Sequence, residues 1–80
     1  MKQSEARIII YLRNCHPSLR TKIATSKKLG IDFSYTCKTM ELMADKQWVS
    51  KQKYPLKTYF LITDRAPIKE AVEMLQGNQK

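Results

Sequence analysis

Apolar side chains recur at helical spacing through the first half of the chain, beginning with the stretch SEARIIIYLRN at residues 4–14. The positions expected to cover a core are Ala6, Ile9, Ile10 and Leu12. Ile8 and Tyr11 then lie on another side of the helix. Because one layer of core contacts does not use so many apolar positions, this helix is either deeply buried or packs its second face on another subunit. Pro17 ends the stretch, since the residue before a proline is disfavoured in a helix.

Residues 21–49 have the pattern of two short helices joined by a glycine-containing turn, which is typical of a helix-turn-helix. Gly30 permits a left-handed turn that a residue with a Cβ resists. Ile31 is expected to fill the angle between the helices. Asp32 is a good N-cap, because its carboxylate accepts the free amide donors of a helix start. The second helix is therefore predicted to begin at Phe33.

Spacing divides this second helix into two faces. Thr36, Met40 and Met43 fall at i, i+4 and i+7, which is the pattern of a stripe facing the core. The remaining face is left for a partner and presents aromatic, hydroxyl and charged groups that suit base edges and phosphates. Its members are Phe33, Ser34, Tyr35, Cys37, Lys38 and Glu41.

Two strands are predicted after the helices. Residues 47–49 form a short first strand, and residues 58–63 form a β-branched and aromatic second strand. The connection SKQKYPLK at residues 50–57 is expected to project as a loop, which describes a wing. Its cations and its exposed aromatic residue are Lys51, Lys53, Lys57 and Tyr54.

A last helix is predicted from Ala66 to Gln76, with Thr63 or Asp64 as its cap and Pro67 in its first turn. Gly77 ends it, and the residues that follow are expected to fray. The apolar surface of this helix consists of Ala71, Val72, Met74 and Leu75. The order of elements predicts an α+β winged helix-turn-helix with a three-helix core, a two-stranded wing and a C-terminal helix.

Length and charge limit the function. Eighty residues suit one small domain over residues 1–80, with a modest core that oligomerisation would help. A formal charge of +8 and a pI near 9.7 favour a polyanionic partner. Between residues 20 and 57 nine bases face three acids. The nine are Arg20, Lys22, Lys27, Lys28, Lys38, Lys46, Lys51, Lys53 and Lys57, of which Lys22, Lys27, Lys28 and Lys38 are predicted to contact phosphates.

Several classes of site are disfavoured. No apolar run approaches the roughly 18 residues of a membrane span and no signal peptide is visible, so a cytoplasmic location is expected. Cys15 and Cys37 are expected to be reduced thiols. Cys15 beside His16 offers too few ligands for zinc and the wrong geometry for a catalytic pair. We therefore expect no metal, no cofactor and no enzymatic activity.

Two segments carry a resemblance to a known family: KIATSKKLGIDFSYTCKTMELMADKQWV at residues 22–49 and YFLITDRAPIKEAVEML at residues 59–75. In order and spacing they resemble winged-helix DNA-binding regulators of the MarR-like and small archaeal or viral kind. The resemblance covers nearly the full length. It implies binding of double-stranded DNA by a homodimer, formed through the first and last helices, that acts as a transcription regulator and repressor.

The same resemblance implies which residues meet DNA. Those on the base-reading helix are Phe33, Ser34, Tyr35, Cys37 and Lys38, and those on the wing are Lys51 and Lys53, with Tyr54 beside them. Alternatives remain at this point. The lysines can form a solvated face, Phe33 and Tyr35 can be core aromatics, and Cys37 can respond to oxidants. The whole module can instead bind protein or RNA within a larger assembly.

Overall fold

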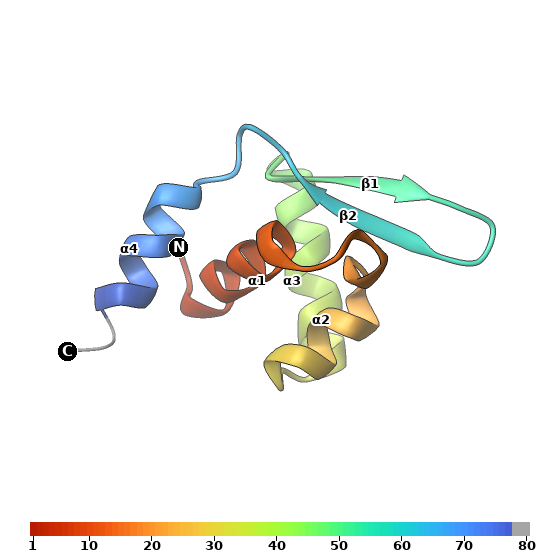
Figure 1. Ribbon diagram of the computed structural model, residues 1–80, viewed down its shortest axis with the longest axis horizontal. Helices are drawn as coiled ribbons and strands as arrows, with labels where there is room; N and C mark the ends of the chain where they lie inside the picture. The colour runs from red at the N-terminus through yellow and green to blue at the C-terminus, as the bar shows by residue number, and fades with distance from the viewer. Residues whose placement is uncertain (78–80) are drawn as a thin grey trace.

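The element order predicted from the sequence is present in the computed structural model, which describes residues 1–77 (Figure 1). The elements are α1 (Gln3–Asn14), η1 (Pro17–Leu19), α2 (Lys22–Leu29), α3 (Phe33–Asp45), β1 (Val49–Lys53), β2 (Thr58–Ile62) and α4 (Ile68–Gly77). The fold is α+β and is a winged helix-turn-helix, as predicted. No helix within residues 1–77 has the length and apolar character needed to cross a membrane. The C-terminal residues expected to fray, 78–80, lie outside the described residues.

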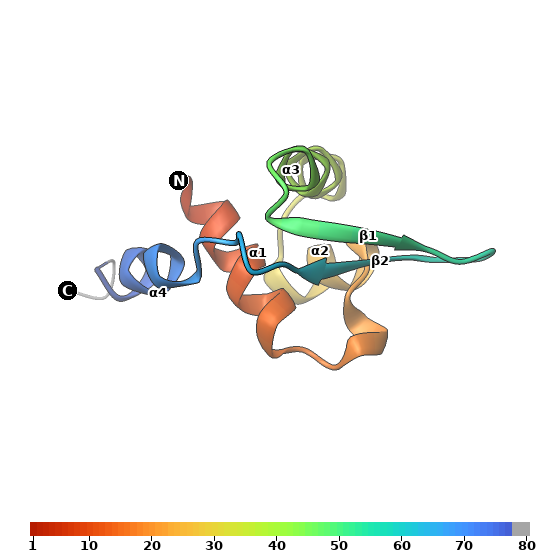
Figure 2. The ribbon, with the colours of Figure 1, turned by 90° about the horizontal axis from the view of Figure 1, so that it is seen from above.

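Helix α1 lies at the centre of the molecule. Seen from above, α4 covers one side of it, and α2, α3 and the hairpin lie on the other (Figure 2). Ile8, Ile9 and Leu12 are fully buried. The expectation that Ile8 faces away from the core is therefore wrong, because the chain covers both sides of this helix itself. Ile10, which was expected in the core, is only partly buried.

The predicted core stripe of α3 is confirmed. Thr36, Met40 and Met43 have no exposed surface, and the two methionines join the α1 residues in the main apolar cluster. Phe60 of β2 completes this cluster from the hairpin. Burying an apolar side chain of this size stabilises a fold by about 1.5–3 kcal/mol. The core therefore fixes the orientation of α3 relative to the rest of the chain.

The hairpin is longer than predicted. Strand β1 runs antiparallel to β2 and extends to Lys53, paired with Thr58, so Lys51 and Lys53 belong to a strand and not to a loop. The prediction placed the first strand at residues 47–49, whereas only Val49 of these is in β1. Residues 51–53 have low β propensity by themselves. They form a strand because they pair with the β-branched and aromatic β2. The loop is thereby reduced to residues 54–57.

The start of α4 also differs from the prediction. The helix begins at Ile68 and not at Ala66, and Pro67 immediately precedes it. The predicted cap, Thr63, donates its hydroxyl instead to the carbonyl of Gln47 at 2.6 Å. The same oxygen accepts from the N–H of Arg65 at 3.2 Å, but α4 begins only at Ile68, so neither Thr63 nor Asp64 lies at its cap position.

Candidate nucleic-acid interface

The turn between α2 and α3 is built by short-range hydrogen bonds. Thr21 caps α2 by accepting from the N–H of Ala24 at 3.2 Å. Gly30 ends the helix with φ 65° and ψ 33°, the left-handed conformation predicted for it. The Ser26 hydroxyl donates to the carbonyl of Ile31 at 2.6 Å, which closes the turn. These bonds fix the angle at which α3 leaves α2.

Asp32 caps α3 as predicted, since its carboxylate accepts from the N–H of Tyr35 at 3.0 Å. Helix α3 then begins at Phe33. Its buried stripe leaves the opposite side to solvent, where Ser34 and Lys38 are exposed one turn apart. A row of side chains one turn apart on an uncovered helix is the geometry that can follow a DNA groove.

The two aromatic residues at the start of α3 are both on the surface. Phe33 is 49% exposed and Tyr35 is 39% exposed, which excludes the interpretation of either as a core aromatic. The Tyr35 hydroxyl lies 2.9 Å from that of Ser4 on α1. Cys37 is partly buried and, like Cys15, is a free thiol, as expected. The start of α3 therefore presents the exposed ring of Phe33 and the ring of Tyr35, which is hydrogen-bonded to α1.

The predicted basic residues separate into two groups. Lys22 and Lys51 meet at Glu41, whereas Lys27 and Lys28 line a different surface. That second surface is an open recess of about 820 Å³ between α1, α2 and Leu75 of α4. The structure thus does not bring all predicted phosphate contacts to one place.

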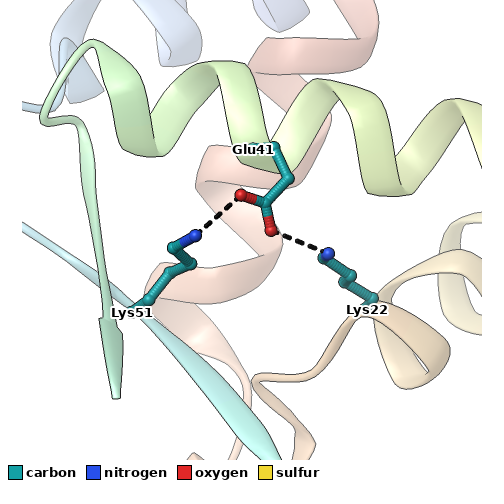
Figure 3. Close-up of polar contacts among 3 residues, drawn as sticks. All are labelled: Lys22, Glu41 and Lys51. Atoms are coloured by element: carbon teal, nitrogen blue, oxygen red, sulfur yellow. Dashed lines mark hydrogen bonds and ion pairs between the residues drawn. The ribbon is translucent and has the colours of Figure 1, made fainter. Parts of the chain in front are cut away.

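Glu41 on α3 joins Lys22 of α2 to Lys51 of β1 (Figure 3). Each lysine Nζ lies 2.8 Å from one carboxylate oxygen. Hydrogen bonds from Lys22 and then from Lys51 hold the pKa of Glu41 below its usual value. Glu41 was expected on the partner face, but its pairing was not, because the two lysines lie 19 and 10 residues away in the chain and no local pattern links them.

The other residues of the wing that were predicted to contact DNA lie beyond the Lys22–Glu41–Lys51 cluster. Lys53 is exposed near the end of β1, on the same face of the hairpin as Lys51, because alternate residues of a strand share a face. Tyr54 is 57% exposed, and its ring packs edge-on against Tyr59 with centroids 5.6 Å apart. Leu56 at the tip is almost fully exposed. The wing therefore projects both cations and apolar surface.

Within residues 1–77, no three His, Cys, Asp or Glu side chains gather in a way that would hold a metal ion. The His16 ring is 2.8 Å from the hydroxyl of Ser18 and accepts its N–H, so it caps η1. The uncovered face of α3 and the wing are thus the features that remain to be explained.

A recognition-type helix beside a β-hairpin defines the class of winged-helix proteins. No protein-family model and no curated protein matches the sequence. Solved structures do match over 99% of this chain. They include a MarR family protein from Bacillus stearothermophilus (TM-score 0.78, 15% identity), a variant of Lactococcus lactis ZitR (0.76, 15%) and zinc-bound AdcR, a zinc-dependent MarR family transcriptional regulator (0.71, 16%).

The particular form of the fold is accordingly that of the MarR family, as the sequence resemblance implied. At 15–16% identity this likeness concerns the fold alone. The chain spans 56%, 53% and 59% of the lengths of these three proteins. It thus corresponds to little more than half of each.

Proposed function

We propose that this protein binds double-stranded DNA sequence-specifically as a transcription regulator, with α3 in the major groove. The observation that carries the proposal is the uncovered face of α3, which presents Ser34, Lys38 and two exposed aromatic rings beside a basic wing. Hydroxyl groups and cations are suited to base edges and phosphates. The net charge of +8 supplies attraction to a polyanion.

The structural neighbours support this choice of function. AdcR is described as a transcriptional regulator, and the Streptococcus pyogenes AdcR structure is that of the adhesin competence repressor. We propose the same role for this chain: it regulates transcription in the cytoplasm and acts as a repressor. Lys51 and Lys53 would then lie beside the DNA backbone or the minor groove, and Tyr54 near them.

We also propose that two copies form a homodimer through the terminal helices. Ile8, Ile9 and Leu12 of α1 are buried within their own chain, but Ile10 and Tyr11 remain partly exposed, as do Met74 and Leu75 of α4. Val72 on α4 is only partly buried and is outside the set of side chains packed on the core. Val72→Glu should therefore shift the mass measured by sedimentation equilibrium from that of a dimer to that of a monomer, without lowering helix content. A wild-type chain that is already monomeric would contradict the proposed dimer.

Selection from a random pool of duplex DNA, followed by sequencing, tests the main proposal. We expect enrichment of a palindrome whose half-sites lie about one helical turn, roughly 34 Å, apart. If a dimer neutralises about 6–10 phosphates, affinity should fall by roughly 10³ to 10⁵ between 50 and 200 mM salt. Absence of enrichment, or displacement by structured RNA, would favour the alternative of a protein- or RNA-binding module in a larger assembly.

A further inference from the structure

Glu41 occupies the point where three elements of the candidate interface meet. Its Oε2 accepts from Lys22 at the first position of α2, and its Oε1 accepts from Lys51 on the wing (Figure 3). Both distances are 2.8 Å. One carboxylate on α3 thus holds the lysines that α2 and the wing contribute.

The cluster is open to solvent and to a partner. The side chains of Lys22, Lys51 and Glu41 are 29%, 33% and 41% exposed. With its pKa lowered by the two lysines, Glu41 remains ionised at neutral pH, and the cluster carries one net positive charge. A phosphate that approaches either lysine must therefore compete with a carboxylate already in place.

This competition acts differently on the two modes of DNA binding. Non-specific binding comes almost entirely from cations that meet phosphates, so lysines held by Glu41 contribute less to it. Specific binding adds contacts to base edges. A carboxylate only accepts hydrogen bonds, and the major groove offers it the amino groups of cytosine and adenine as donors, of which the adenine group lies beside an N7 acceptor that disfavours a carboxylate.

We propose that Glu41 determines specificity by withholding Lys22 and Lys51 from phosphates until the one free N–H of a base-paired cytosine amino group donates to its carboxylate and both lysines turn to phosphates. The released lysines then bind the phosphates on either side of that base. This inference rests on the proposed DNA binding, and it adds a residue that couples base reading to backbone contact.

The first test compares Glu41→Gln with Glu73→Gln. Both variants lose one negative charge, but Glu73 is an exposed residue on α4, and no ion pair involves it within residues 1–77. Measured by fluorescence anisotropy on random-sequence duplex, Glu41→Gln should raise non-specific affinity about threefold to tenfold and steepen its salt dependence. Glu73→Gln should change it less than about twofold. Equal effects of the two variants would overturn the inference.

The second test repeats the duplex selection with Glu41→Ala. Wild-type protein should enrich a cytosine at a fixed position of each half-site, and the variant should lose preference at that position alone. An unchanged preference in the variant would overturn the inference while leaving the proposed function standing. Failure of the wild-type chain to bind any duplex would instead overturn both, so the two failures are distinguishable. Circular dichroism of each variant controls for folding.

Discussion

The hydroxyl of Tyr35 in the first turn of α3 lies 2.9 Å from the hydroxyl of Ser4 in the first turn of α1. This contact lowers the pKa of Tyr35 and is made on the surface. It attaches the end of α3 that would enter a groove directly to the central helix. Orientation of the Tyr35 ring thus depends on a residue 31 positions earlier in the chain.

The Tyr35–Ser4 contact can be tested by a double-mutant cycle. Tyr35→Phe and Ser4→Ala each remove the same hydrogen bond. We therefore expect the free energy of unfolding of the double variant to be no lower than that of the less stable single variant. Urea unfolding of the four proteins measures the coupling. Additive losses would show that the two hydroxyls act independently. Ser34→Ala, one residue away, removes no side-chain hydrogen bond within residues 1–77 and should leave stability unchanged.

Lys38 is the exposed cation at the centre of the uncovered face of α3. Lys38→Ala should weaken binding to all DNA sequences by about threefold to tenfold and reduce the slope of log K against log salt by about 1. Lys69→Ala on α4 makes the same change in net charge away from this face and serves as the control. Equal losses in the two variants would mean that total charge, and not the face of α3, governs binding.

Gly30 is needed for its backbone conformation and not for space. Its φ is 65°, yet a Cβ built there meets no atom within 4 Å. Gly30→Ala should therefore lower the free energy of unfolding by only the left-handed strain, about 1–2 kcal/mol, as measured by chemical denaturation. Gly30→Asn should lose less, because asparagine adopts this region more readily. Gly77→Ala, where φ is not positive and space is also open, should cost nothing.

Features of the fold that depend on residues close together in the chain could be predicted from the sequence, whereas features that depend on distant residues could not. The Asp32 cap, the Gly30 turn and the Met40/Met43 stripe are written in neighbouring residues, and all three were predicted correctly. The extension of β1 to Lys53 depends on its partner strand, which sequence spacing does not specify. The same holds for the Glu41 cluster, whose members come from three separate elements.

Acid should destabilise the fold through Glu5. Burial raises the pKa of this carboxyl, but hydrogen bonds from the Lys2 N–H and the Lys46 ammonium outweigh burial and leave the pKa lowered. A lowered pKa in the folded state means that the stabilisation is present above the ordinary value of 4.5 and is lost as pH falls below it. Thermal melts of wild type and Glu5→Gln should therefore differ at pH 7 and converge at low pH. A constant difference across this range would contradict the assignment.

The hairpin is held to the body by buried side chains at its base and, further along β1, by the ion pair between Lys51 and Glu41. Val49 and Phe60 are buried at the base, and the Phe60 N–H donates to the carbonyl of Arg20 at 2.8 Å, whereas residues 50–57 are exposed. Beyond Lys51, residues 52–57 are exposed and project from the body of the protein. The tip of the wing can therefore adapt to surfaces of different width while the core behind it keeps its packing.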